Sequence, residues 1–313
     1  MRKDIHKVCS KCDVCLLTKR NNKHRNYGLL PEKKAESEPW EILCIDLIGP
    51  YKIPTKKKPR QKKVRELELW ALTMIDPATG WLEIKEIKTK RADNIANVLE
   101  QTWLSRYPRP SVLTFDRGTE FMAEVTKMIR NDYGIKKRPI TARNPQANAI
   151  IERVHQTIAN IIRTFDLTNT VIEEENPWSG ILAATMFAIR STVHTTSQYT
   201  PMQLVFGRDS ILNISHEANW KLIQARKQRL IRQNNIRENR KRIPHIYKVG
   251  DKVLIKQDQS AKYANASYKG PYYTVSAVNN NGTVRIDMGI VSDTYNIRQI
   301  YPYRRPTPNK RNR

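Results

Sequence analysis

The sequence predicts an α/β protein in which a mixed five-stranded sheet is flanked by helices and followed by a small all-β barrel. Apolar runs of strand length alternate with helical patterns from residue 41 to residue 192. Residues 247–303 hold short alternating runs separated by turns, and a hydrophobic content of 39% supports packed cores. The length of 313 residues suits two or three small domains.

Three predicted strands precede the first helix. Residues 41–49 (EILCIDLIG) are apolar on both faces, as expected of a central strand that is covered on both sides. Residues 67–76 and 81–88 flank a turn at 77–80, and residues 81–88 alternate apolar and polar side chains. The pair therefore predicts an antiparallel hairpin with one half-buried strand, and Asp76 is interpreted as a turn former.

Helical and strand patterns alternate after residue 90. The predicted order is a helix over 91–105, a strand over 111–116, a helix from Thr119, a strand over 135–142 broken by Pro139, a helix that carries Glu152 and extends through Phe165, and a helix over 178–192. This order is the ribonuclease H type of topology. Ligand sites in α/β sheets collect at the carboxyl ends of the strands.

The charge of the chain predicts a polyanionic partner. Its 56 basic and 30 acidic residues give a net charge of +26, which suits phosphate neutralisation. A membrane surface is the main competitor, but no long basic amphipathic helix dominates, and the apolar run 180–189 is too short to cross a bilayer. Residues 52–65 hold eight basic residues and no acid, which is typical of a solvated hairpin tip or of a patch for nucleic acid or nuclear import. We expect an intracellular protein with no membrane partner.

Three carboxylates on separate elements predict the reactive centre. Asp46 lies inside the first apolar run, Asp116 ends a short buried strand, and Glu152 lies on a helix 35 residues further on. A single acid of this kind is ordinarily a turn, a cap or a solvated salt bridge. A carboxylate in a buried strand needs compensation, and several converging carboxylates suit Mg²⁺ or Mn²⁺.

The cysteines predict metal binding rather than disulfides. Cys9, Cys12 and Cys15 follow one another at C-x-x-C spacing, and a C-x-x-C pair is half of a tetrahedral zinc site. His6 and His24 are the nearby histidines. A set of reduced thiols at a frayed N-terminus is an equally weighted reading.

The motifs together resemble one family, the integrases of gypsy-type long-terminal-repeat retrotransposons, and more distantly the retroviral integrases. The matching pieces run in order over nearly the whole chain: Cys12-x-x-Cys15, WEILCIDLIGP (40–50), LTMIDPATGW (72–81), TFDRGTEF (114–121), NPQANAIIERVHQTI (144–158), TPMQLVFG (200–207), VGDKVLIK (249–256) and KGPYYTV (269–275). The resemblance implies five regions: a partial zinc-binding remnant (1–30), a ribonuclease H-like catalytic core (31–210), a basic helical linker (211–245), a GPY-type barrel that binds DNA and multimerises (246–304), and a basic tail (305–313).

The resemblance also implies an activity. Asp46, Asp116 and Glu152 would hold two Mg²⁺ or Mn²⁺ ions and carry out phosphodiester chemistry without a covalent protein nucleophile. The family trims the 3′ ends of element DNA and joins them to target DNA. The implied partners are double-stranded DNA and further copies of the chain, and the implied location is the nucleus of a eukaryotic host.

Two departures from the family matter. Its amino-terminal zinc module uses two histidines well upstream of the cysteine pair, whereas here there is room only for His6. We therefore expect a truncated module in which Cys12 and Cys15 are the remaining candidate zinc ligands. Retroviral relatives place lysines one and two turns after the catalytic Glu, where this chain has Gln156 and Ala159. The candidate DNA contacts are then Arg153, Arg163, Lys57, Lys58 and Arg60, while His155 is interpreted as a packing or DNA-contact residue rather than a metal ligand.

Two other functions fit parts of the sequence. A decayed or domesticated element product would bind DNA without chemistry; the intact acids oppose this reading, and the shortened N-terminus favours it. Ribonuclease H-like cleavage of RNA in hybrids shares the fold, but the barrel and the 35-residue spacing oppose it.

Overall fold

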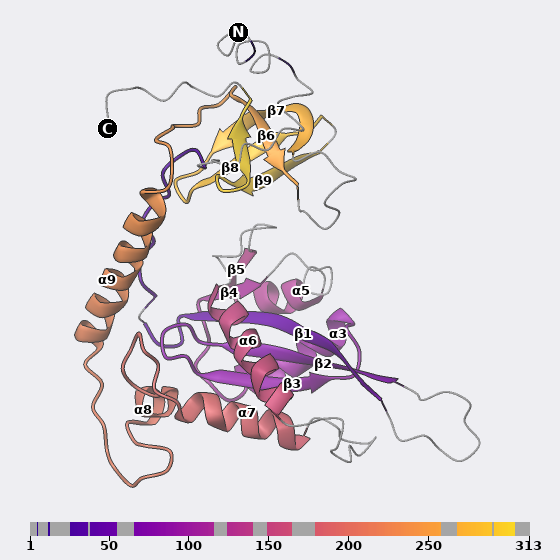
Figure 1. Cartoon of the computed structure of the whole chain (residues 1–313). Coiled ribbons are helices and arrows are strands. Elements are labelled where there is room, and N and C mark those ends of the chain that lie inside the picture. The colour runs from indigo at the N-terminus through magenta and orange to yellow at the C-terminus, as the bar shows by residue number, and fades with distance from the viewer. Residues whose placement is uncertain are drawn as a thin grey trace. The chain divides into compact units, whose positions relative to one another are not determined.

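The computed structural model describes residues 26–36, 38–54, 66–115, 124–139, 149–164, 179–257, 268–289 and 291–303, together with Ile5 and Cys12. The chain divides into two compact units (Figure 1). We call Ala35–Ile140 with Pro145–Gln228 the core unit, and Met1–Lys34 with Thr141–Asn144 and Arg229–Arg313 the terminal unit.

The core unit contains the predicted mixed five-stranded sheet. Its strands are β1 (Ile42–Pro54), β2 (Glu66–Ile75), β3 (Leu82–Ile87), β4 (Val112–Phe115) and β5 (Lys136–Pro139), in the order β3-β2-β1-β4-β5. The first three strands pair antiparallel, whereas β4 runs parallel to both β1 and β5. The predicted fold class is confirmed.

Helices cover both faces of this sheet (Figure 1). They are α3 (Ala92–Leu99), the π-helical turn η1 (Glu100–Leu104), α5 (Glu124–Asn131), α6 (Ala149–Thr164), α7 (Ser179–Ser191) and α8 (Pro201–Phe206). The helix α9 (Trp220–Asn239) begins in the core unit and ends in the terminal unit. None of the helices in the described part of the chain has the length and apolar character needed to span a bilayer.

The central strand β1 is buried from both sides, as its apolar run predicts. Leu43 and Ile45 lie in a buried cluster with side chains of α3 and α5. Cys44 and Ile48 lie in a second buried cluster with side chains of α6 and α7. Successive strand residues point to opposite faces, so one strand supplies both cores. Burial of each of the aliphatic side chains Leu43, Ile45 and Ile48 stabilises the fold by about 1.5 to 3 kcal/mol.

The predicted helix over 91–105 is two elements. After α3 the backbone continues as η1, where a π-helical turn carries the fully buried Trp103. The short helix α8 is begun by a complete capping box: the Thr200 side chain accepts from the backbone of Gln203, and the Gln203 side chain accepts from the backbone of Thr200. Gly207 ends α8 with a φ of 66°, a conformation that favours glycine.

Asp76 shapes the turn between β2 and β3. Its Oδ1 accepts from the Ala78 backbone at 2.9 Å, and its Oδ2 accepts from the Thr79 hydroxyl at 2.8 Å. Lys227 lies nearby and donates to the carbonyl oxygens of Pro77 and Ala78. Burial raises the pKa of Asp76, although these hydrogen bonds oppose the shift. The interpretation of Asp76 as a turn former is confirmed.

The terminal unit contains the predicted all-β element as a curled antiparallel sheet. Its strands are β6 (Lys252–Lys256), β7 (Tyr268–Val278), β8 (Thr283–Asp287), β9 (Ser292–Asn296) and β10 (Ile300–Pro302), in the order β10-β6-β7-β8-β9. All four described strand pairings are antiparallel.

A segment from the other end of the chain completes the core of this sheet. Tyr27 and Leu30 are buried in the same cluster as the strand residues. Tyr27 forms a parallel bridge with Ile243. The buried Arg242 guanidinium donates to the carbonyl oxygens of Gly28 at 2.5 Å and Tyr27 at 2.8 Å. Residues 26–30 are therefore structural parts of the terminal unit.

Candidate active site

Asp46 lies on the central strand of the core sheet. Its partner in the register with the adjacent strand β2 is Thr73. The Asp46 side chain is 20% exposed, and its Oδ1 accepts from the Leu47 backbone N–H at 2.8 Å. Asp46 thus presents an oxygen donor of the kind that Mg²⁺ prefers.

The neighbouring strand β4 ends beside β1. The parallel register pairs Cys44 with Thr114, and each of these residues stands two positions before one of the predicted acids, Asp46 and Asp116. Phe115 is the last residue of β4, and Asp116 itself lies outside the described residues. The described strands therefore place the residue before Asp116 next to the part of β1 that leads to Asp46.

The helix α6 carries position 152 to the same region. Its residues Val154 and Ile158 pack in the cluster that contains Cys44 of β1. His155 Nδ1 lies 4.0 Å from Asp46 Oδ2. Positions 152 and 155 are three apart in a helix and so lie on one side of it. The backbone of Glu152 is described, whereas its side chain lies outside the described atoms.

The hydrogen bonds around His155 define its tautomer. Thr73 Oγ1 lies 2.9 Å from the carbonyl oxygen of Asp46, which can only accept, so the hydroxyl donates there. The same Oγ1 lies 2.8 Å from His155 Nε2, and because its one proton is already used, the ring N–H is the donor. Burial lowers the pKa of His155 to about 4. At neutral pH the ring is uncharged, and Asp46 and His155 do not form an ion pair.

Cysteine chemistry is excluded at this position of β1. Cys44 is buried two residues before Asp46 and is a free thiol. Burial raises its pKa to about 12, so the thiol stays protonated at physiological pH. The thiolate, not the thiol, is the nucleophile and metal ligand. Cys44 therefore serves as a small core residue.

The other predicted ligands are described only in part. Arg163 is exposed in the last turn of α6 and donates to Asn160 at 2.9 Å. Cys12 is half-buried, and Cys15 lies outside the described residues. Lys57, Lys58 and Arg60 also lie outside them, as does the side chain of Arg153. Among the described residues no three His, Cys, Asp or Glu groups converge on a metal position.

Thr73 is a site residue that sequence reasoning missed. It is fully buried in β2 and contacts both Asp46 and His155. The available signal was a hydroxyl within the apolar run LELWALTMI, where an unpaired polar group would be costly. The sequence could not name its partners, because His155 is 82 positions away.

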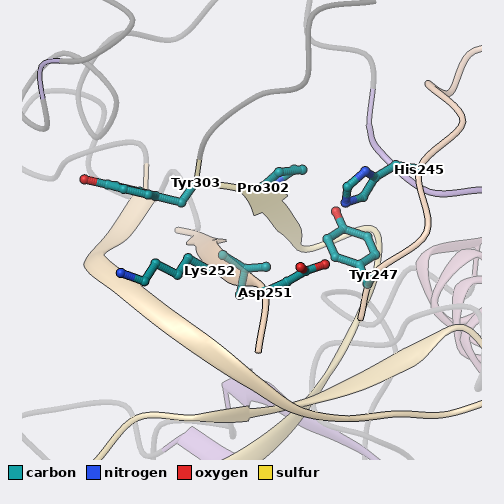
Figure 2. Close-up of a pocket in the computed structure, with 7 residues that line it drawn as sticks. His245, Tyr247, Asp251, Lys252, Pro302 and Tyr303 are labelled. Carbon is teal, nitrogen blue, oxygen red and sulfur yellow. The ribbon is translucent and has the colours of Figure 1, made fainter. Parts of the chain in front are cut away.

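The terminal unit has a hollow of its own (Figure 2). Its volume is about 380 Å³, and its lining comprises His245, Tyr247, Asp251, Lys252, Val253, Pro302 and Tyr303. At its rim Lys252 Nζ lies 4.1 Å from the centre of the Tyr272 ring, and that ring lies 5.0 Å from Tyr303. An ammonium beside the exposed Tyr272 ring suits a nucleic acid, which offers phosphates and flat bases.

The core unit combines a mixed sheet with an acid on its central strand, and its sequence matches a known domain family. Residues 36–145 match the integrase core domain family. The matched segment contains Asp46 and Asp116 and ends just before α6.

The chain is homologous to retroviral and transposon Pol polyproteins. It is 27% identical over 232 residues to the Pro-Pol polyprotein of simian foamy virus type 3, covering 72% of this chain and 18% of that protein. It is 26% identical over 286 residues to the Gag-Pol polyprotein of koala retrovirus, covering 86% of this chain and 16% of that protein. It is 25% identical over 265 residues to the retrovirus-related Pol polyprotein from transposon 412 of Drosophila melanogaster, covering 77% of this chain and 20% of that protein. The chain thus spans a fifth or less of the length of these relatives.

The whole chain also resembles a solved structure. A chain of the simian T-cell lymphotropic virus intasome, solved in complex with the PP2A regulatory subunit B56 gamma, aligns with a TM-score of 0.61. The alignment covers 99% of this chain and 92% of that chain at 13% sequence identity. At this identity the likeness establishes the fold. The chain therefore shares its fold with that intasome chain, and its residues 36–145 match the integrase core domain.

Proposed function

We propose that this chain is the integrase of a gypsy-type retrotransposon, an enzyme that trims the 3′ ends of element DNA and joins them to target DNA. One observation carries the proposal: Asp46, on the central strand, is contacted by the helix that carries Glu152, and the strand that precedes Asp116 lies alongside. The match of residues 36–145 to the integrase core domain supports it.

Three carboxylates would form the reactive centre. Asp46, Asp116 and Glu152 would hold two divalent cations, which when bound activate the attacking hydroxyl and stabilise the leaving oxygen of a phosphodiester. The donor set fits hard cations such as Mg²⁺ or Mn²⁺, because carboxylate oxygens are their preferred protein ligands. The Leu47 N–H orients the Asp46 carboxylate by its hydrogen bond to Oδ1. The uncharged His155 ring adds no positive charge that would compete with a cation.

Double-stranded DNA is the proposed substrate. The net charge of +26 favours a polyanion, and Arg163 is exposed on the helix that carries Glu152. We assign Lys57, Lys58, Arg60 and Arg153 to the same role on the basis of the sequence. Assembly into a homo-oligomer and work in the nucleus of a eukaryotic host belong to this proposal, and zinc at Cys12 and Cys15 stays a prediction.

A joining assay tests the proposal. The purified chain is incubated with Mn²⁺ and a labelled DNA duplex, beside an Asp116→Asn variant and a sample with EDTA. We expect nicked and joined products from the wild type alone. Equal products from wild type and variant would reject the catalytic claim. DNA binding that depends on salt but not on EDTA or Asp116 would favour a decayed, DNA-binding product, whereas cleavage of an RNA–DNA hybrid alone would favour ribonuclease H-like hydrolysis.

The rim of the hollow in the terminal unit is expected to contact DNA. Lys252→Gln should weaken binding of any duplex and lower the slope of log affinity against log salt by about 1, because one phosphate contact is lost. Fluorescence anisotropy at several salt concentrations measures both quantities. Arg285→Gln is the matched control: it removes the same charge from an exposed position of β8 that does not line the hollow. Equal salt slopes for the two variants would exclude a specific contact at Lys252.

A further inference from the structure

Two consecutive hydrogen bonds join the helix of Glu152 to the strand of Asp46. The ring N–H of His155 on α6 donates to Thr73 Oγ1 on β2 at 2.8 Å, and the Thr73 hydroxyl donates to the Asp46 carbonyl oxygen on β1 at 2.9 Å. Asp46 and Thr73 are also partners in the strand register. The connection therefore runs across three elements and ends on the backbone of a proposed metal ligand.

Described side chains of α6 also pack against the sheet through apolar contacts. Val154 and Ile158 pack against side chains of the cluster that includes Cys44 and Ile48. Apolar burial is non-directional, so such contacts hold a helix against a sheet without fixing its rotation closely. A hydrogen bond, in contrast, restricts both distance and angle. The bond from His155 is thus a directional contact between α6 and β2.

Water cannot easily take over this bond. Thr73 has 0% of its surface exposed, and the His155 side chain is 19% exposed. A buried donor or acceptor that loses its partner retains the full cost of desolvation. Burial therefore favours the position of α6 in which His155 Nε2 is hydrogen-bonded to Thr73 Oγ1.

We propose, on the basis of the function proposed above, that His155 is a positioning residue that fixes the helix of Glu152 relative to Asp46 through Thr73. Its Nε2 is committed to Thr73, and its Nδ1 is 4.0 Å from Asp46 Oδ2, which is beyond hydrogen-bond distance. The ring acts through placement of the helix. Outer groups that orient metal ligands typically change metal affinity or activity by about 10- to 100-fold when they are removed.

Paired variants of the full chain separate this role from simple packing. His155→Leu removes the donor and fills a similar space, whereas His155→Gln keeps an N–H near the position of Nε2. Thr73→Val removes the hydroxyl at nearly constant shape, and Thr73→Ser restores it. Each variant is measured for thermal unfolding, for Mn²⁺ binding without DNA by electron paramagnetic resonance, and for kcat and KM of joining.

We expect the two variants that lack the bond, His155→Leu and Thr73→Val, to bind Mn²⁺ about 10- to 100-fold more weakly and to lose kcat by a similar factor, with KM for DNA unchanged. The two variants that keep it should stay within about threefold of the wild type. A ¹⁵N spectrum of histidine-labelled wild type should contain a signal from a ring protonated at Nε2 only that disappears in His155→Leu. The chain has six histidines, so this comparison assigns the signal.

The outcomes are distinct. If the wild type joins DNA, Asp46→Asn does not, and His155→Leu matches the wild type, the positioning role is wrong and the proposed function stands. If His155→Gln is as impaired as His155→Leu, the hydrogen bond is not what matters. If the wild type neither binds Mn²⁺ nor joins DNA, both proposals fail. Should His155→Leu not fold, the Thr73→Val and Thr73→Ser pair decides.

Discussion

An Asp46→Asn variant is expected to lose DNA joining by at least about 10³-fold, since several kcal/mol of stabilisation by bound cations depend on the carboxylate charge. The substitution keeps the shape of the side chain and an acceptor for the Leu47 N–H, which Asp46 Oδ1 accepts at 2.8 Å. The fold should persist for that reason. Joining of a labelled duplex in Mn²⁺, measured beside circular dichroism and DNA affinity in EDTA, checks all three expectations.

Asp93→Asn is the matched control for this loss. Asp93 lies in the first turn of α3, and its side chain is 46% exposed beside Arg91. The same chemical change there should leave joining at the level of the wild type. Asp46→Asn joining DNA within about tenfold of the wild type would contradict a role in holding cations.

An Arg190→Met variant is expected to lose about 3 to 5 kcal/mol of unfolding free energy, because the buried Glu83 would be left without its charge partner. Arg190 of α7 lies 2.6 Å from Glu83 Oε1 and donates to the Leu82 carbonyl oxygen at 2.7 Å. Its guanidinium also lies 4.1 Å from the centre of the Trp81 ring. Glu83 is 6% exposed and further accepts from the Tyr107 hydroxyl at 2.5 Å. Urea denaturation followed by fluorescence measures the loss.

A double variant separates the charge from the packing. Glu83→Gln combined with Arg190→Met removes both charges, so no uncompensated charge stays buried. The double variant should therefore be more stable than Arg190→Met alone. Arg91→Met serves as a control: its partner Asp93 is exposed, so the cost should be below about 1 kcal/mol. A loss at Arg190 no larger than that at Arg91 would show that the pair contributes little.

The layout of the core sheet could be predicted because its strands carry strong local patterns. The apolar run around Asp46 indicates a strand covered on both faces, and the structure has that strand at the centre of the sheet. The end of the strand over 111–116 was likewise expected next to it, and the parallel register pairs Cys44 with Thr114. Periodicity reports which faces are apolar, and this information suffices to order the layers.

The contacts between distant polar residues could not be predicted in the same way. His155 and Thr73 are separated by 82 positions, and Arg190 and Leu82 by 108. Such pairs depend on the rotation of a helix and on strand register, neither of which is encoded in local hydropathy. The capping box at Thr200 is a different case, since the pattern Thr-x-x-Gln before an apolar run was readable.

The packing of residues 26–30 into the terminal unit has a consequence for biosynthesis. Gly28 and its partner Arg242 are 214 positions apart. At about 5 to 20 residues per second, roughly 10 to 40 s of translation separate them, and folding proceeds from the first complete unit onward. In a ribosome-bound chain that ends before β6, the core unit would be folded. Tyr27 and Leu30 would still lack the strands of the terminal unit that bury them. Residues 26–30 are thus translated before the core unit but pack only after the strands of the terminal unit have been made.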